Sequence, residues 1–143
     1  MKKSKVKICG LTNLADARFA AGAGADYLGF IFVEGTPRYI EPAMVSAISE
    51  WVEGPNKVGV FQNQELSSVT ETARLVGLDM IQLHGQESTE YCSLVSENHR
   101  IIKVFSVDEQ TNSADLSREL QGYKNVCEYI MFDTKVGSQS GGT

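Results

Sequence analysis

The chain has 143 residues, of which 42% are hydrophobic and 22% charged, proportions typical of a globular domain that exclude collagen-like, low-complexity and disordered classes. Lysine and arginine number 13 against 18 aspartate and glutamate residues, a formal net charge of −5, so no nucleic-acid partner is expected. No apolar run approaches the ~20 residues of a membrane span, and the basic start lacks the apolar run of a signal peptide, so we expect a cytoplasmic protein without a membrane partner.

Predicted strands and helices alternate from the start of the chain. The first strand covers residues 5–9, and Asn13 then caps a helix that ends at Gly22 and Gly24. Runs rich in β-branched and apolar residues predict five more strands, at residues 26–33, 57–61, 79–83, 101–105 and 128–132. Between them, helical periodicity predicts helices at residues 41–52, 65–76, 87–97 and 113–121. This alternation indicates an α/β fold with a parallel sheet.

Two architectures fit this alternation. An open doubly wound sheet can be completed in 143 residues, whereas an eight-stranded (β/α) barrel needs about 200 or more. Length therefore favours the open sheet. Residues 133–143 favour the barrel, because they form a polar loop after the sixth strand and then stop, as if the chain were cut within a loop.

In either architecture, ligands bind beyond the carboxyl ends of the parallel strands. Polar or reactive residues end several of the predicted strands: Cys9, Gln62, Asn63, His84 and Asp133, with Arg38 in the loop after the second strand. Strand alternation places Lys7 and Cys9 on one side of the first strand, and Asp133 on the corresponding side of the sixth. If the sheet closes, an ammonium, a thiol and a carboxyl group face one interior, a set that can perform acid–base chemistry.

Each of these residues also has a structural interpretation. A cysteine at a strand end is more often buried packing, Asp133 can cap a turn, His84 can bond a neighbouring loop, and Arg38 can be a solvated charge. The three cysteines, Cys9, Cys92 and Cys127, are far apart in the sequence, and their spacing indicates neither a disulfide framework nor a metal site. The chain contains no dinucleotide, NTP, zinc-protease or esterase motif, so no cofactor is predicted.

Six motifs, in order along the chain, resemble one family, the phosphoribosylanthranilate isomerases of tryptophan biosynthesis. They are residues 7–13 (KICGLTN), 29–32 (GFIF), 36–40 (TPRYI), 58–61 (VGVF) and 78–85 (LDMIQLHG), followed by Asp133 with residues 140–143 (SGGT). Six motifs in the right order are far more specific than any one of them. The resemblance implies a (β/α)8 TIM barrel, of which residues 1–143 are a single domain covering about the first six strands.

The resemblance also implies a reaction and its residues. The family performs an Amadori rearrangement of a small phosphosugar substrate without a cofactor, as a monomer or homodimer. Carried over motif by motif, it makes Cys9 the general base, Asp133 the general acid and Arg38 the ligand of the anthranilate carboxylate. His84 would line the substrate, as would Gln82 and Lys7.

The chain departs from the family pattern in two places. Gln62 stands where the family more often has an apolar residue, in a loop that tolerates change. The family holds the substrate phosphate with loops after strands seven and eight, which this sequence does not include. Six strands alone would expose two unpaired edges, so we expect the sequence to be part of a polypeptide of about 200 residues. The alternative function is a non-catalytic truncated barrel that binds a ligand or partner without turnover.

Overall fold

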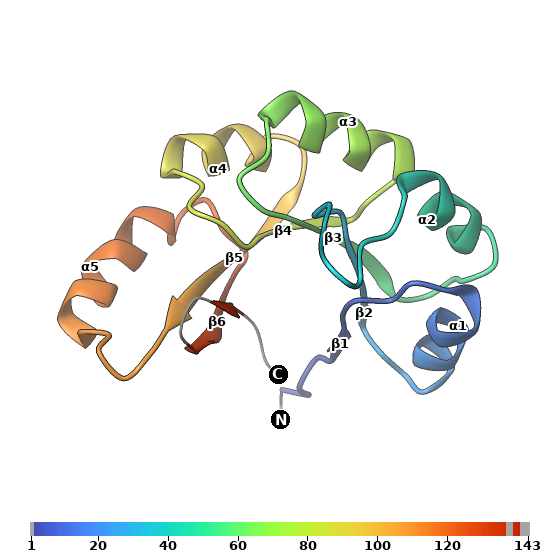
Figure 1. Ribbon diagram of the computed structural model, residues 1–143, viewed down its shortest axis with the longest axis horizontal. Coiled ribbons are helices and arrows are strands. Elements are labelled where there is room, and N and C mark those ends of the chain that lie inside the picture. Colours follow the sequence, from blue (N-terminus) through green and yellow to red (C-terminus); the bar gives the residue numbers. More distant parts are fainter. Residues whose placement is uncertain (1, 137–138, 141–143) are drawn as a thin grey trace.

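The computed structural model describes residues 2–136 and 139–140 of the chain, with side chains as far as Thr134. Strands line the concave side of a curved, incomplete barrel, and the helices follow one another along its convex side (Figure 1). The strands are β1 (Lys7–Ile8), β2 (Tyr27–Ile31), β3 (Asn56–Phe61), β4 (Met80–Leu83), β5 (Arg100–Val107), β6 (Tyr129–Val136) and β7 (Gln139–Ser140). The helices are α1 (Leu14–Gly22), α2 (Pro42–Ser49), α3 (Leu66–Val76), α4 (Thr89–Ser96) and α5 (Ser113–Tyr123).

The first six strands lie side by side in sequence order, each parallel to the next. This order, with a helix in every crossover, is the arrangement of a (β/α) barrel, whereas a doubly wound sheet reverses its strand order. Because all six strands run in the same direction, their carboxyl ends share one rim. Among the pairings, Ser106 of β5 lies opposite Asp133 of β6, so Asp133 sits at that rim.

Two apolar clusters hold the barrel fragment together. The larger lies between sheet and helices and includes Phe30 and Phe61 from the strands with Val45 and Val69 from α2 and α3. The smaller lies on the concave face and contains Tyr27, Val58, Met80 and Ile102. Burial on both faces explains why β2 to β5 read in the sequence as continuous apolar runs.

Local signals place the helix ends. The Asn13 side chain accepts a hydrogen bond from the Asp16 amide at 2.8 Å, as predicted for the cap of α1. Gly77 ends α3 in the left-handed conformation, with φ of 74°, which glycine adopts without strain.

The end of the described chain differs from the prediction of a polar loop. β6 continues through Val136, and β7 pairs antiparallel with it, Lys135 opposite Ser140. Thr134 and Lys135 are polar, and a strand prediction based on apolar runs therefore stopped too early. Of the glycine-rich stretch, residues 137–138 and 141–143 lie outside the described residues.

Apolar side chains lie exposed along both outer strands. On the β1 side, Val6, Ile8 and the α1 residue Phe19 are 49%, 40% and 80% exposed, and they line a cavity of about 500 Å³. On the β6 side, Phe132 is 53% exposed. These are the two edges expected to lose their cover in a six-stranded fragment. Among the described helices, none is long and apolar enough to cross a membrane.

Candidate active site

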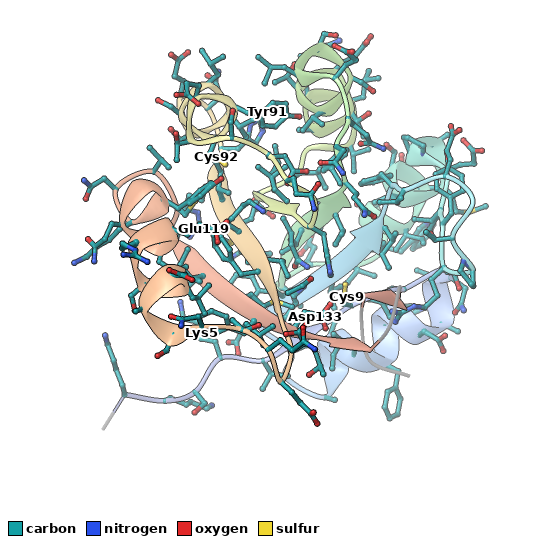
Figure 2. The ribbon with its side chains drawn as sticks, turned by 60° about the vertical axis from the view of Figure 1, so that its left-hand side comes forward. Lys5, Cys9, Tyr91, Cys92, Glu119 and Asp133 are labelled. Atoms are coloured by element: carbon teal, nitrogen blue, oxygen red, sulfur yellow. The ribbon has the colours of Figure 1, made fainter. Side chains whose placement is uncertain are left out.

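The carboxyl-end rim carries the residues that the sequence predicted for chemistry. Cys9 follows β1, Arg38 lies in the loop after β2, His84 follows β4, and Asp133 lies on β6. Figure 2 shows Cys9 and Asp133 on the same side of the sheet. The fold therefore gathers at one end four groups that are up to 124 residues apart in the sequence.

His84 and Asp133 are in direct contact. The imidazole Nε2 lies 3.0 Å from the Asp133 Oδ2, and their side chains are 21% and 14% exposed. The His84 amide donates to the Phe61 carbonyl at 2.9 Å, which fixes the main chain of His84 at the end of β4. An imidazole in this position restrains the carboxyl group and can exchange a proton with it. The half-buried pair still faces solvent, so a ligand can reach the Asp133 carboxyl.

Cys9 is held where β1 and β2 approach closely. A Cβ added at Gly29 would lie 2.8 Å from the Cys9 Sγ, so β2 needs a glycine opposite the thiol. The Arg38 Nη1 donates to the Cys9 carbonyl oxygen at 3.2 Å and passes over Gly10, whose φ is 81°. The exposed guanidinium is therefore anchored beside the thiol and keeps other N–H groups for an anionic ligand.

Lys7 and Gln82 lie deeper than the rim. The Lys7 Nζ donates to the Gln82 Oε1 across the barrel interior, from β1 to β4. Gln82 is only 2% exposed and each of the two residues precedes a rim residue by two positions, Cys9 and His84 respectively. The structure thus places these two residues, each predicted to line the substrate, beneath the thiol and the imidazole as a polar layer in the interior.

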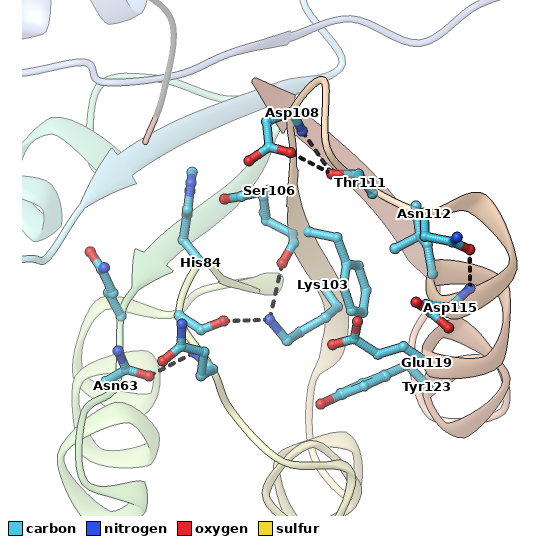
Figure 3. Close-up of a pocket in the computed structure, with 16 residues that line it drawn as sticks. Asn63, His84, Lys103, Ser106, Asp108, Thr111, Asn112, Asp115, Glu119 and Tyr123 are labelled. Carbon is cyan, nitrogen blue, oxygen red and sulfur yellow. Dashed lines mark hydrogen bonds between the residues drawn. The ribbon is translucent and has the colours of Figure 1, made fainter. Parts of the chain in front are cut away.

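A large cavity covers only one half of the rim. It measures about 540 Å³ and opens between the ends of β3, β4 and β5 and one side of α5 (Figure 3). His84 and Gln62 line it, together with Lys103, Asp108 and Tyr123, whereas Cys9, Arg38 and Asp133 do not. A ligand that contacted all of the predicted residues would therefore extend from this cavity across the open concave side.

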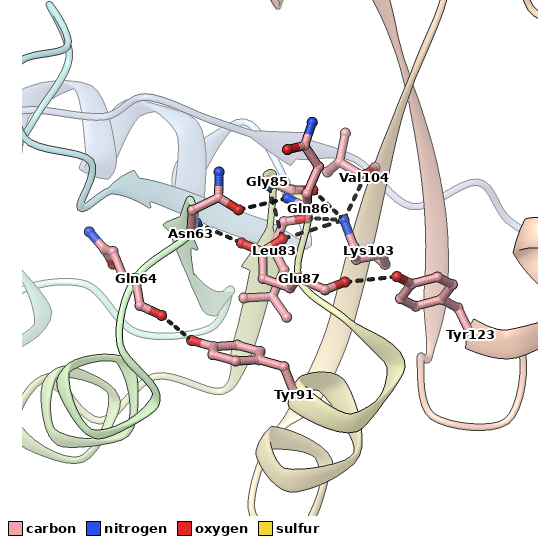
Figure 4. A network of polar contacts seen from close by, with 10 residues as sticks. All are labelled: Asn63, Gln64, Leu83, Gly85, Gln86, Glu87, Tyr91, Lys103, Val104 and Tyr123. Atoms are coloured by element: carbon pink, nitrogen blue, oxygen red, sulfur yellow. Dashed lines mark hydrogen bonds and ion pairs between the residues drawn. The ribbon is translucent and has the colours of Figure 1, made fainter.

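A buried polar network below the rim was missed by the sequence analysis (Figure 4). The Glu87 carboxylate accepts from the amides of Asn63 and Gly85, both at 2.9 Å, and lies 3.4 Å from the Lys103 Nζ. Lys103 in turn donates to the Gly85 carbonyl at 2.8 Å. The signal that could have found it is a lysine in the middle of the apolar strand β5, where a charge needs a partner.

The other two thiols lie away from the rim. Cys92 is buried on α4 and contacts Cys127, which is half-buried just before β6. Their contact, together with burial, raises the pKa of Cys92, and the same contact lowers the pKa of Cys127. Among the described residues, no cluster of three or more histidine, cysteine or acidic side chains could hold a metal ion.

Comparison with known proteins identifies the family. The family model described as N-(5'-phosphoribosyl)anthranilate (PRA) isomerase matches residues 6–143. The chain belongs to this family. The isomerase of Citrifermentans bemidjiense is 45% identical over 141 residues, which cover 98% of this chain and 65% of that relative. The curated PRA isomerases it matches are longer, and the chain spans 50% to 65% of their lengths.

Solved PRA isomerase structures share the fold. The Thermotoga maritima crystal structure has a TM-score of 0.86 and 36% sequence identity, covering 99% of this chain and 66% of that one. The Thermus thermophilus structure has a TM-score of 0.82 and 31% identity, covering 95% and 65%. The prediction that the chain forms the first six strands of the family's TIM barrel is confirmed. One solved PRA isomerase is a complex with reduced 1-(o-carboxyphenylamino)-1-deoxyribulose 5-phosphate, and the Thermotoga maritima enzyme is described as dimeric.

Proposed function

We propose that the carboxyl-end rim catalyses the isomerisation of N-(5-phosphoribosyl)anthranilate to 1-(2-carboxyphenylamino)-1-deoxyribulose 5-phosphate, a step of tryptophan biosynthesis. The observation that carries the proposal is the 3.0 Å contact between His84 and Asp133, which holds a carboxyl group at the rim that also carries Cys9 and Arg38. Membership of the PRA isomerase family supports it. The reaction is an internal redox exchange between neighbouring carbons, so it requires an acid and a base and no external oxidant.

In the proposed mechanism, Asp133 acts first as the acid. It donates a proton to the ring oxygen of the ribose, the bond from that oxygen to the anomeric carbon breaks, and the nitrogen lone pair forms a Schiff base. His84 holds the Asp133 carboxyl through Nε2 during this transfer. The Cys9 thiolate then removes the proton from the adjacent sugar carbon, which gives an enolamine. Tautomerisation of the enolamine yields the ketose.

Arg38 binds the carboxylate of the anthranilate ring in this proposal. A guanidinium can bind a planar carboxylate through two parallel hydrogen bonds, which fixes both the position and the plane of the ring. Because Arg38 is already bonded to the Cys9 carbonyl, the carboxylate and the thiol are held in a fixed relation. Lys7 and Gln82 form the polar floor under the sugar, with the carboxamide held by the ammonium.

A second candidate is a barrel fragment that binds the same ligand without turnover. The exposed Val6, Ile8, Phe19 and Phe132 favour it, because they show that both edges of the barrel fragment are uncovered, which gives water access to the interior from either side. Access of water weakens the electrostatic interactions on which acid–base catalysis depends. Binding without conversion would distinguish this candidate from the isomerase.

Turnover tests the proposal directly. Loss of the anthranilate fluorescence of the substrate is followed with the 143-residue chain and with its Cys9→Ser and Asp133→Asn variants. Cys127→Ser is the matched control, because it removes a thiol near the amino end of β6 instead of at the rim. We expect conversion by the chain and by Cys127→Ser, and loss of at least 100-fold in both rim variants. Equal rates with and without protein would contradict the proposal, and tight binding in that case would favour the second candidate.

A further inference from the structure

The most deeply buried ion pair among the described residues, Lys103 with Glu87, takes no part in the proposed mechanism. The side chains of Lys103 and Glu87 are 3% and 2% exposed, and their charged atoms lie 3.4 Å apart. Removing two charges from water is unfavourable, and their attraction offsets this only when further hydrogen bonds satisfy both groups. Apolar residues of similar size would fill the same space, so the pair calls for an explanation beyond packing.

The contacts of this pair converge on one short loop. Both oxygens of Glu87 accept backbone amides, Oε1 from Gly85 and Oε2 from Asn63, each at 2.9 Å. Lys103 donates to the Gly85 carbonyl at 2.8 Å and lies 3.5 Å from the Leu83 carbonyl. The carbonyl of Val104, on its own strand, is 3.1 Å away. The ion pair thus contacts the residue before His84 and the residue after it.

The other side of the loop is held by β3. The His84 amide donates to the Phe61 carbonyl at 2.9 Å, and the Gln86 amide donates to the Asn63 Oδ1 at 2.7 Å. The main chain at His84 is therefore bonded toward β3 on one side and toward β5 on the other. A loop held in this way presents the imidazole in one direction, the direction in which Nε2 meets Asp133.

Lys103 is not placed to bind an anionic ligand itself. An ammonium group has three N–H donors, and four oxygen atoms surround this one: three backbone carbonyls and the Glu87 carboxylate. The Phe105 and Tyr123 rings lie 5.1 Å and 5.9 Å from the same nitrogen. Although Lys103 lines the large cavity, its charge is already satisfied by protein groups.

We propose that Glu87 and Lys103 are positioning residues, which hold the loop at Gly85 so that the His84 imidazole stays in contact with the Asp133 carboxyl. The effect of this ion pair on catalysis rests on the proposed function, but its effect on the position of the His84 imidazole can be tested without turnover. The pair acts through the main chain of one loop and touches neither the imidazole nor the reacting carboxyl. Removing it should leave the barrel fragment folded in a suitable variant and still disturb the imidazole.

NMR of the imidazoles is the test, because His84 and His99 are the two histidines of the chain. The reference is Asp133→Asn, which shows the His84 signals when the imidazole has lost its carboxylate partner. The decisive protein is the double variant Lys103→Met with Glu87→Gln, which removes both charges together and leaves no unpaired charge in the core. Arg118→Met with Asp115→Asn is the matched control, because it removes an exposed ion pair on α5.

In the double variant we expect the His84 ring signals to move at least halfway to their positions in Asp133→Asn, while His99 stays unchanged as a report on folding. The exposed control pair should leave both histidines unchanged. A folded double variant with wild-type His84 signals would overturn the inference. If the double variant does not fold, Lys103→Arg decides, because it keeps a cation beside the Glu87 carboxylate and changes the donors that reach the Gly85 and Leu83 carbonyls. Absence of turnover in the wild-type chain would contradict the proposed function and leave this readout intact.

Discussion

Gly29→Ala tests the close approach that positions the Cys9 thiol. The new Cβ would lie 2.8 Å from the Cys9 Sγ, 3.1 Å from its Cα and 3.2 Å from its Cβ. Favourable contacts between such atoms begin near ~3.5 Å, so β1 must retreat from β2 by about half an ångström. Gly10 and Leu11 donate their amides to the Gly29 carbonyl at 3.0 and 3.1 Å, and this retreat strains both bonds.

The loss in the free energy of unfolding depends on how easily β1 can move. Overfilling a packed site costs about 1–3 kcal/mol. β1 is an outer strand with two residues paired to β2, so it can yield, and we expect a loss of about 1–2 kcal/mol in the free energy of unfolding. A misplacement of about 1 Å can reduce a rate 100-fold, so a shift of half that size should reduce turnover about 10-fold.

Urea denaturation followed by circular dichroism measures the stability, with Gly22→Ala as the matched control. Gly22 ends α1, and an added Cβ there meets nothing within 4 Å. The control should gain about 0.4–1 kcal/mol, because alanine restricts the unfolded chain without strain in the folded one. If Gly29→Ala were as stable as the control, the close approach of β1 to β2 would be refuted.

The buried charges, thiols and imidazole each affect stability or reactivity in a measurable way. Lys103→Met leaves the Glu87 carboxylate buried without its partner, so the free energy of unfolding in urea should fall by about 3–5 kcal/mol, and adding Glu87→Gln should recover part of it. A double variant no more stable than the single one would argue against this account. The contact with Cys92 lowers the pKa of Cys127, so iodoacetamide should alkylate Cys127 well before the buried Cys92. Mass spectrometry of peptides measures the two rates, and equal rates would contradict the lowered pKa of Cys127. Burial lowers the pKa of His99 in the folded chain below its ordinary value of 6.5. As the pH falls below 6.5, His99 therefore becomes protonated in the unfolded chain before it does in the folded one, and the free energy of unfolding decreases. Between pH 7.5 and 5.0 the wild type should therefore lose more stability than His99→Gln, and equal losses would argue against the burial effect.

The parallel strands and the shared rim were predictable from local patterns, whereas the sequential strand order of a barrel was implied only by the family resemblance. Apolar runs separated by helical segments predict parallel strands, and parallel strands bring their ends to one rim. The element bounds were less accurate where polar residues continue a strand. β6 extends through Thr134 to Val136, because it pairs with β5 as far as Val107 and then with β7, contacts that no local pattern contains.

The contacts within the site were not predictable from local patterns. His84 and Asp133 are 49 residues apart, and their contact depends on the curvature that brings β4 and β6 together. The sequence placed Lys7 on the same side of the first strand as Cys9, and the structure directs its ammonium to Gln82. Such pairings depend on side-chain directions in the barrel interior, which strand alternation restricts to a face and does not specify further.

The central claim is that this barrel fragment carries the family's ligand site at the carboxyl ends of its strands. The most direct measurement is heteronuclear NMR of the 15N-labelled chain, titrated with reduced 1-(2-carboxyphenylamino)-1-deoxyribulose 5-phosphate. The account predicts that the amide signals of Cys9, Arg38, His84 and Asp133 shift together, while that of Arg100, at the opposite end of β5, stays in place. Shifts at the amino ends of the strands, or no shift at the rim at saturating ligand, would contradict it.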